Sequence, residues 1–232
     1  MKKTALLFAI PLTLLSCSNK EIKEVKDPLN GQLIEQFETT ETEDGSFLKN
    51  GFYKNWYPNG QIKENGFYKN GKKTEKWLTY FDNGQIESSG LYEEGKKTGK
   101  WLTYFKNGQI QFDVEQLRDT LNGTFIQYFE NGNIKQQAEY IMGKKNGEGR
   151  VYNKEGYLEM IVNYENNVFH GTKTFFYKSG KKAAEFHYKK GMKDGLLTFW
   201  HENGVKSSEE NYANDKLIKS SVVKWDEAGN IN

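Results

Sequence analysis

Residues that could carry catalysis are few and scattered in this sequence. Its three histidines, His170, His187 and His201, lie 17 and 14 residues apart and form no His-Glu or His-x-x-His pair, so zinc-site spacing is missing. The one cysteine, Cys17, has no partner for an intrachain disulfide or a Cys/His metal site. The glycines recur at fixed intervals and form no phosphate-binding loop. We therefore expect no enzyme, no cofactor and no metal.

Cys17 is instead placed for lipid attachment. Lys2 and Lys3 precede an apolar stretch from Thr4 to Leu15, which is too short to span a bilayer and is typical of a signal peptide. The following Leu14-Leu15-Ser16-Cys17 resembles the bacterial lipobox. This predicts a signal peptide over 1–16 and acylation of Cys17, where each buried CH₂ contributes about 0.8 kcal/mol to membrane binding. The alternative is an ordinary secretory signal with an incidental cysteine.

The segment that follows favours an envelope location. Ser18 stands where an inner-membrane retention Asp would stand in the Gram-negative sorting rule, so we expect the outer membrane or the cell surface. Without Lys2 and Lys3 the mature chain has equal numbers of basic and acidic residues, which argues against nucleic-acid binding. Residues 17–44 are polar and are predicted to be a lipid anchor with a flexible linker.

Residues 45–232 show a repeat of 24 residues. Four columns recur at this period: an aromatic residue, a glycine four residues later, a tyrosine with one exception, and a position that holds only Gly, Asn or Asp. The glycines are Gly60, Gly84, Gly108, Gly132, Gly156, Gly180 and Gly204, and the aromatics are Trp56, Tyr80, Tyr104, Tyr128, Tyr152, Phe176 and Trp200. Two turn positions per repeat predict an all-β, elongated antiparallel meander of about eight β-hairpins.

The first turn of each repeat could contain two residues, or three with Gly in the left-handed position. We favour three, which sets Tyr80 opposite Ile86 and places Leu78, Tyr80, Ile86 and Tyr92 on one face. In this register the aromatic column stacks as a structural ladder. The opposite face would expose the residues that we predict to bind a partner, which are Trp77, Trp101, Phe81, Phe105, Phe125 and Phe129. Alternatively, the sheet coils enough to bury them.

Lysines gather near the turns, and most follow the second turn. They are Lys72, Lys73, Lys96, Lys97, Lys144, Lys145, Lys181, Lys182, Lys189 and Lys190. They could form a basic rim that meets anionic lipid or polysaccharide. The other interpretation is that they solvate the turns and protect strands from edge pairing.

The segment Gly99-Lys100-Trp101-Leu102-Thr103-Tyr104-Phe105-Lys106-Asn107-Gly108 resembles the MORN repeat variant, also known from the YwqK family of bacterial proteins. The resemblance covers about residues 46–231. It implies an interaction or membrane-proximal module, sometimes proposed to bind phospholipid, and many relatives are called antitoxins. We expect a membrane-anchored binding, adhesion or scaffolding module with a protein or glycan partner. The alternatives are an immunity protein that neutralises a toxin and an envelope lipid or glycan binder.

Overall fold

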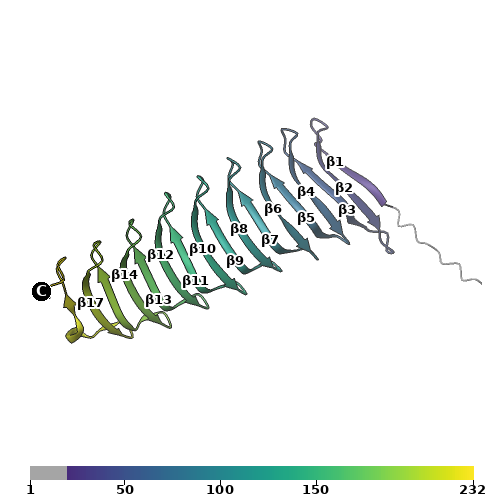
Figure 1. Ribbon diagram of the computed structural model, residues 1–232. Coiled ribbons are helices and arrows are strands. Elements are labelled where there is room, and N and C mark those ends of the chain that lie inside the picture. Colours follow the sequence, from purple (N-terminus) through teal and green to yellow (C-terminus); the bar gives the residue numbers. More distant parts are fainter. Residues whose placement is uncertain (1–19) are drawn as a thin grey trace, which may run out of the picture.

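The structure is a computed structural model that describes residues 20–232. These residues form one antiparallel sheet of 19 strands, and the hairpins follow one another along an elongated array whose described ends lie far apart (Figure 1). Within this range there is no α-helix, and one 3₁₀ turn spans Lys219–Ser221. The predicted all-β meander of hairpin repeats is confirmed.

The strands follow the chain order, and each of the longer ones pairs with its neighbours in sequence. They are β1 Lys20–Lys26, β2 Leu33–Glu41, β3 Phe47–Trp56, β4 Ile62–Lys69, β5 Lys72–Tyr80, β6 Ile86–Glu93, β7 Lys96–Tyr104, β8 Ile110–Leu117, β9 Thr120–Tyr128, β10 Ile134–Ile141, β11 Lys144–Tyr152, β12 Leu158–Glu165, β13 Val168–Phe176, β14 Lys182–Lys189, β15 Met192–Lys193, β16 Gly195–Trp200, β17 Lys206–Ala213, β18 Lys216–Leu217 and β19 Val223–Lys224.

The sheet begins earlier than the sequence predicts. Strands β1 and β2 pair with each other, and β2 pairs with β3, so the predicted flexible linker is wrong for residues 20–41. This segment has too few apolar residues for a core of its own, but the edge of the repeat sheet supplies backbone partners for it. Thr39 in β2 is 2% exposed. The predicted signal peptide and Cys17 lie outside the described residues.

The two turns of each repeat differ in length. In the first turn the amide of Phe81 donates to the carbonyl of Gln85, and Gly84 donates back to Phe81, which encloses three residues. Tyr80 therefore pairs with Ile86, as predicted. The second turn contains two residues, and both have positive φ, for example 50° and 80° at Glu94 and Gly95. This is the geometry of a type I′ turn, which suits the twist of adjoining strands.

The register of the first hairpin places the tyrosine column on the other face from the one predicted. Thr79 pairs with Ser88 but Tyr80 pairs with Ile86, so one residue of β6 has no partner and the alternation of side chains changes there. Tyr92 consequently lies on the face of Trp77, and their ring centroids are 5.9 Å apart. The prediction that Tyr92 shares a face with Tyr80 is wrong. We call the face that carries Trp77 the inner face and the opposite one the outer face.

The inner face contains the core of the sheet. All of the buried hydrophobic residues lie on it: Tyr53, Trp77, Trp101, Val114, Val162, Ala184 and Leu197. A chain of ring contacts runs through Tyr53, Tyr68, Trp77, Tyr92 and Trp101, with successive centroids 5.1 to 5.9 Å apart. The predicted exposure of Trp77 and Trp101 is therefore wrong.

A bulge opposite a glycine explains how a single-layer sheet buries a tryptophan. Between β4 and β5, three residues up to Trp77 lie opposite the single residue Gly66, and Trp101 stands in the same relation to Gly90. The ring then lies directly over the glycine. A Cβ atom on Gly66 would be 2.4 Å from the ring of Trp77, and one on Gly90 would be 2.1 Å from that of Trp101. Only glycine leaves this space.

The predicted aromatic ladder lies on the outer face and does not stack. Trp56, Tyr80, Tyr104, Tyr128, Tyr152, Phe176 and Trp200 are each half-buried. Among residues 20–232, none of the ring pairs at stacking distance includes any of them. Since each is followed 24 residues later by the next, the rings are two strands apart, about 10 Å, which is too far for direct stacking. The prediction of a stacked ladder is wrong.

Candidate functional site

Of the six residues predicted to bind a partner, three lie on the inner face and three lie in first turns, and together they do not form an open surface. Trp77 and Trp101 are 2% and 6% exposed. The indole nitrogen of Trp77 donates to the carbonyls of Phe67 and Thr74, both at 3.1 Å. A partner could reach these two indoles only if the hairpins opened locally. Trp77 and Trp101 are therefore core residues.

The four phenylalanines of this predicted set are half-buried. Phe125 lies in the core row, with its ring centroid 5.8 Å from that of Phe112 and 5.5 Å from that of Tyr140. Phe81, Phe105 and Phe129 each close a first turn, where the amide and carbonyl of each phenylalanine hold the turn together. Packing and turn formation thus account for their presence.

The outer face carries an exposed apolar surface that the sequence analysis did not select. Phe67 and Leu91 are each 46% exposed. Phe52 pairs directly with Phe67 across the β3–β4 ladder. A shallow hollow here is lined by Phe52, Phe67 and Leu78, with Lys54 and Lys76 beside them. We call the surface formed by Phe52, Phe67, Leu78, Leu91 and Leu102 the outer apolar patch.

The outer apolar patch is confined to the N-terminal hairpins. The register position of Phe67 and Leu91 is occupied in the next three repeats by Glu115, Glu139 and Asn163. Those repeats form the same hairpins with polar residues there. The fold therefore does not require an apolar side chain at this position. The 24-residue spacing of Phe67 and Leu91 is the sequence signal for this patch, but the sequence does not show which face of the sheet is exposed.

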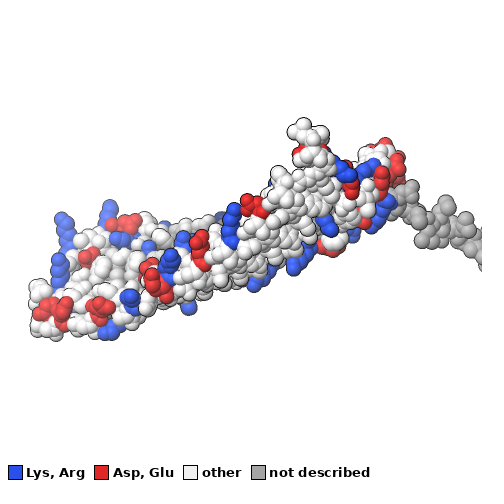
Figure 2. Space-filling view, turned by 90° about the horizontal axis from the view of Figure 1, so that it is seen from above, with Lys and Arg blue, Asp and Glu red and all other residues white. Residues whose placement is uncertain are grey.

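The lysines near the second turn do not form a single rim. Consecutive lysines point to opposite faces, so Lys72 and Lys96 lie on the outer face whereas Lys73 and Lys97 lie on the inner face. In Figure 2, Lys and Arg side chains gather along the margins of the array and uncharged residues fill much of the area between them. The predicted basic rim is thus two separate rows.

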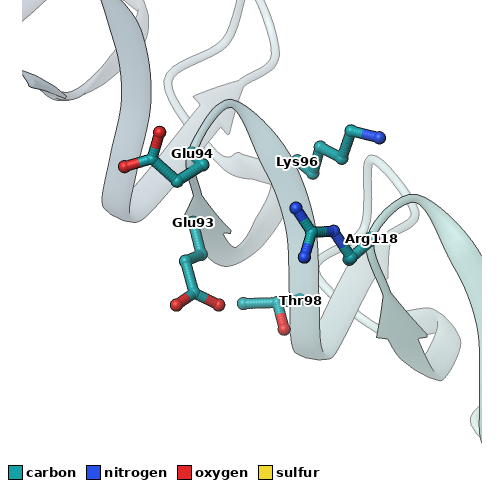
Figure 3. A pocket seen from close by; sticks show the side chains of 5 residues that line it. All are labelled: Glu93, Glu94, Lys96, Thr98 and Arg118. Carbon is teal, nitrogen blue, oxygen red and sulfur yellow. The ribbon is translucent and has the colours of Figure 1, made fainter. Parts of the chain in front are cut away.

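A small hollow of mixed charge lies at the edge formed by the second turns. Its lining residues are Glu93, Glu94, Lys96, Thr98 and Arg118 (Figure 3). Glu94 forms an ion pair of 2.9 Å with Lys72 of the preceding hairpin, and the hydrogen bond from Lys72 lowers the pKa of Glu94. Both residues are well exposed, so this pair adds little to stability. The hollow is therefore a solvated turn edge of mixed charge.

The histidines make separate structural contacts. The Nδ1 atom of His187 lies 2.7 Å from the carbonyl oxygen of Leu196, and the Nε2 atom of His201 lies 3.0 Å from that of Trp225. His170 lies 3.1 Å from Glu165. Over residues 20–232, no three His, Cys, Asp or Glu side chains converge on a position where they could hold a metal ion.

Burial keeps the inner tyrosines protonated. Desolvation, followed by the charges of Glu64 and Glu35, raises the pKa of Tyr68 to about 12. Desolvation also raises the pKa of Tyr92, Tyr140 and Tyr164. These phenols are therefore neutral at physiological pH. They provide ring faces and hydroxyl groups, and none has the lowered pKa of an activated acid or nucleophile.

Comparison with known families agrees with the hairpin repeat. The MORN repeat variant model matches residues 49–70, 76–94, 97–115, 121–142, 169–190 and 193–214, more than half of the chain. The chain belongs to the MORN repeat variant family. MORN repeats of this kind form binding or scaffolding modules that contact proteins or membrane lipids, and the all-β array is typically non-catalytic. Among residues 20–232, no helix is long and apolar enough to cross a membrane.

Other comparisons add little to this assignment. A search of curated proteins found no significant match. Among solved structures, the MORN array is similar to part of one titled "Crystal Structure of TcdB2-TccC3-Cdc42", with 11% sequence identity and a TM-score of 0.17. That match covers 88% of this chain, which spans 15% of the other chain. At this level no role of that complex transfers to the MORN protein.

Proposed function

We propose that this MORN protein is a lipid-anchored module of the cell envelope that binds a protein partner through its outer apolar patch. The observation that supports this most strongly is the exposure of Phe67 and Leu91, 46% each, at a position where later repeats fold with polar residues. Exposed apolar patches on folded proteins mark interaction surfaces more often than they serve the fold. Lys54 and Lys76 line the same hollow, and Lys76 lies between Phe67 and Leu91, so the surface is apolar with interspersed positive charge.

The proposed anchor rests on the sequence before the sheet. Lys2 and Lys3, the apolar stretch and Cys17 have the order that lipoprotein export requires. Strand β1 begins at Lys20, three residues after Cys17. Three residues span at most about 11 Å, so an acylated Cys17 would hold the first hairpins close to the membrane surface. The outer apolar patch would then face partners in or near the envelope, and the array would extend away from it.

The anchor is tested by replacing Cys17 in the full chain. With Cys17→Ser we expect the protein to leave the membrane fraction, and mass spectrometry of the wild-type N-terminus should show acyl groups on residue 17. Conversion of the neighbouring Ser18 to Ala is the matched control and should not change membrane retention. A Cys17→Ser protein that stays in the membrane fraction would contradict the proposed anchor.

The patch is tested by site-specific photo-crosslinking in intact envelopes. A photoreactive residue at Lys76, beside the patch, should give a discrete adduct, whereas one at Glu148, the same register position three repeats later, should not. The double variant Phe67→Asn and Leu91→Asn should remove the adduct. The control Leu117→Asn and Ile141→Asn changes two other exposed apolar residues and should leave it. Equal adducts at both positions would contradict the proposal.

A toxin that acts in the envelope is one partner of this kind, in which case the protein would be its immunity factor. Identification of the adduct by mass spectrometry distinguishes a toxin from a structural envelope protein. Co-expression should then protect cells only while the outer apolar patch is intact.

A further inference from the structure

A row of lysines runs along the inner face, opposite the outer apolar patch. The row follows one position of the 24-residue repeat and consists of Lys49, Lys73, Lys97, Lys145 and Lys193. In the two other repeats this position holds Leu121 and Phe169 instead of lysine. Each repeat contributes two strands to the sheet. Since neighbouring strands lie about 4.8 Å apart, successive positions of the row are about 10 Å apart. The inner face thus carries positive charges at regular intervals.

Tyrosines alternate with these lysines. Four lysines lie directly opposite a tyrosine of the adjacent strand, in the pairs Tyr68–Lys73, Tyr92–Lys97, Tyr140–Lys145 and Tyr188–Lys193. Four ammonium groups also lie over the tyrosine ring of the following hairpin: Lys49 over Tyr68 at 5.5 Å, Lys73 over Tyr92 at 5.5 Å, Lys145 over Tyr164 at 5.3 Å and Lys193 over Tyr212 at 5.1 Å. We call this arrangement the lysine–tyrosine row. The rings fix the ammonium groups in place.

Three charges of the row have no acidic partner in the part of the chain that the structure describes. Lys49 forms an ion pair with Glu35, and Lys73 forms one with Glu64. Among residues 20–232, no carboxylate forms an ion pair with Lys97, Lys145 or Lys193. These three lysines are 48 residues apart, and so about 20 Å apart along the sheet.

Two aspartates at the second turns bind the backbone amides of two of these lysines and not their ammonium groups. Asp119 accepts a hydrogen bond from the backbone amide of Lys97, at 2.8 Å, and Asp215 accepts one from that of Lys193, at 2.7 Å. At the same place beside Lys145 the residue is the uncharged Asn167. These side chains hold the second turns together. The three ammonium groups remain available to a negatively charged ligand.

We propose that the lysine–tyrosine row binds a linear acidic polysaccharide. Carboxylate or sulfate groups of the polymer would meet Lys97, Lys145 and Lys193, and its sugar rings would lie along the tyrosine faces. A thread-like polymer suits a row one side chain wide, with charges at even spacing. A membrane surface is recognised instead by clusters of four to eight projecting basic residues, whereas these lysines are half-buried against rings. This site lies on the other face from the outer apolar patch and does not depend on it.

The experiment measures binding of the protein from residue 20 onward to size-defined hyaluronan and polygalacturonate oligosaccharides at low ionic strength. The test variant carries Lys97→Gln, Lys145→Gln and Lys193→Gln. The matched control carries Lys96→Gln, Lys144→Gln and Lys189→Gln, which removes the same charge from the outer face. Far-UV circular dichroism and the unfolding midpoint confirm that both variants fold.

We expect the inner variant to lose roughly threefold to 150-fold in affinity, because three ion pairs with the ligand are removed, and the outer variant to lose much less. Affinity should rise with oligosaccharide length until the ligand spans all three lysines, about 40 Å, and should fall with salt. Carboxyl-reduced hyaluronan should not bind. Equal losses in both variants, no binding to either polymer, or binding only to vesicles of phosphatidylglycerol and phosphatidylcholine would overturn the proposal.

Discussion

Replacing Trp77 by Ala should destabilise the protein strongly. The side chain is 2% exposed and its indole nitrogen donates to two carbonyls. Its ring also contacts Tyr53, Tyr68 and Tyr92. A buried Trp→Ala change costs about 3 to 5 kcal/mol, and each aromatic pair adds about 0.5 to 1.5 kcal/mol beyond area burial. We therefore expect the upper half of that range.

The matched control is Trp56→Ala, because Trp56 is the same residue type, half-buried on the outer face and without a ring partner at stacking distance. Full burial of a large side chain is worth about 1.5 to 3 kcal/mol, so Trp56→Ala should cost roughly half of that. Urea unfolding followed by circular dichroism gives both free energies. Because repeat arrays can open locally, hydrogen exchange should show whether lost protection centres on β4, β5 and β6. Equal costs for the two variants, or a larger cost for Trp56→Ala, would refute the assignment of faces.

Three further predictions follow from the same contacts. Gly90→Ala places a Cβ 2.1 Å from the indole ring of Trp101 and should lower the free energy of unfolding by about 1 to 3 kcal/mol. In the control Gly149→Ala the nearest atom would be 3.3 Å from the new Cβ, and urea unfolding should show a change close to zero. Equal effects of the two variants would contradict the packing of tryptophan over glycine. Because burial raises the pKa of Tyr68 from near 10 to about 12, the unfolded chain loses this proton first as the pH rises, so the contribution of Tyr68 to stability is constant below pH 10 and is lost from pH 10 to 12. Tyr68→Phe should reduce this alkaline loss, and a tyrosinate titration with every tyrosine ionising near pH 10 would contradict it. Asn107→Ala removes a 3.0 Å hydrogen bond to the carbonyl of Glu130 in the first turn of the next repeat, as well as one within its own turn. Asn83→Ala removes only hydrogen bonds within its own turn, so Asn107→Ala should cost about 1 kcal/mol more in stability. Thermal unfolding compares the two variants, and equal shifts of the midpoint would contradict a role for the contact between turns.

The turns of this protein could be predicted from sequence because they depend on local chemistry. The second turn could be predicted because one of its positions, such as Gly95, holds only Gly, Asn or Asp, which most readily accept positive φ. For the first turn, Asn-Gly left two- and three-residue loops open, and the pairing of Tyr80 with Ile86 favoured the three-residue loop that the structure has. The assignment of faces could not be predicted, because it depends on unpaired residues. One lies in β6 beside the first turn, and others lie opposite glycines such as Gly66. Each bulge changes the alternation without leaving a pattern in composition.

The lysine–tyrosine row was present in the sequence as two columns, but their relation was hidden. Tyr68 and Lys73 are five residues apart, and the two-residue turn between them brings them face to face. The predicted register places the tyrosine column on the outer face, away from the lysines, so the sequence alone predicts either a basic rim or lysines that solvate the turns. Similarly, residues 20–41 have too little apolar character to fold alone, and only the edge of the repeat sheet gives them partners.

Hydroxyl-radical footprinting with mass spectrometry tests most directly whether the tryptophans of the inner face are buried and the outer apolar patch is exposed. We expect Phe67 and Leu91 to be oxidised readily in the native protein, and Trp77 and Trp101 to be protected until it is unfolded. Native oxidation of both tryptophans at the rate of Phe67 would mean that their side chains are not buried, and the assignment of the core would be wrong.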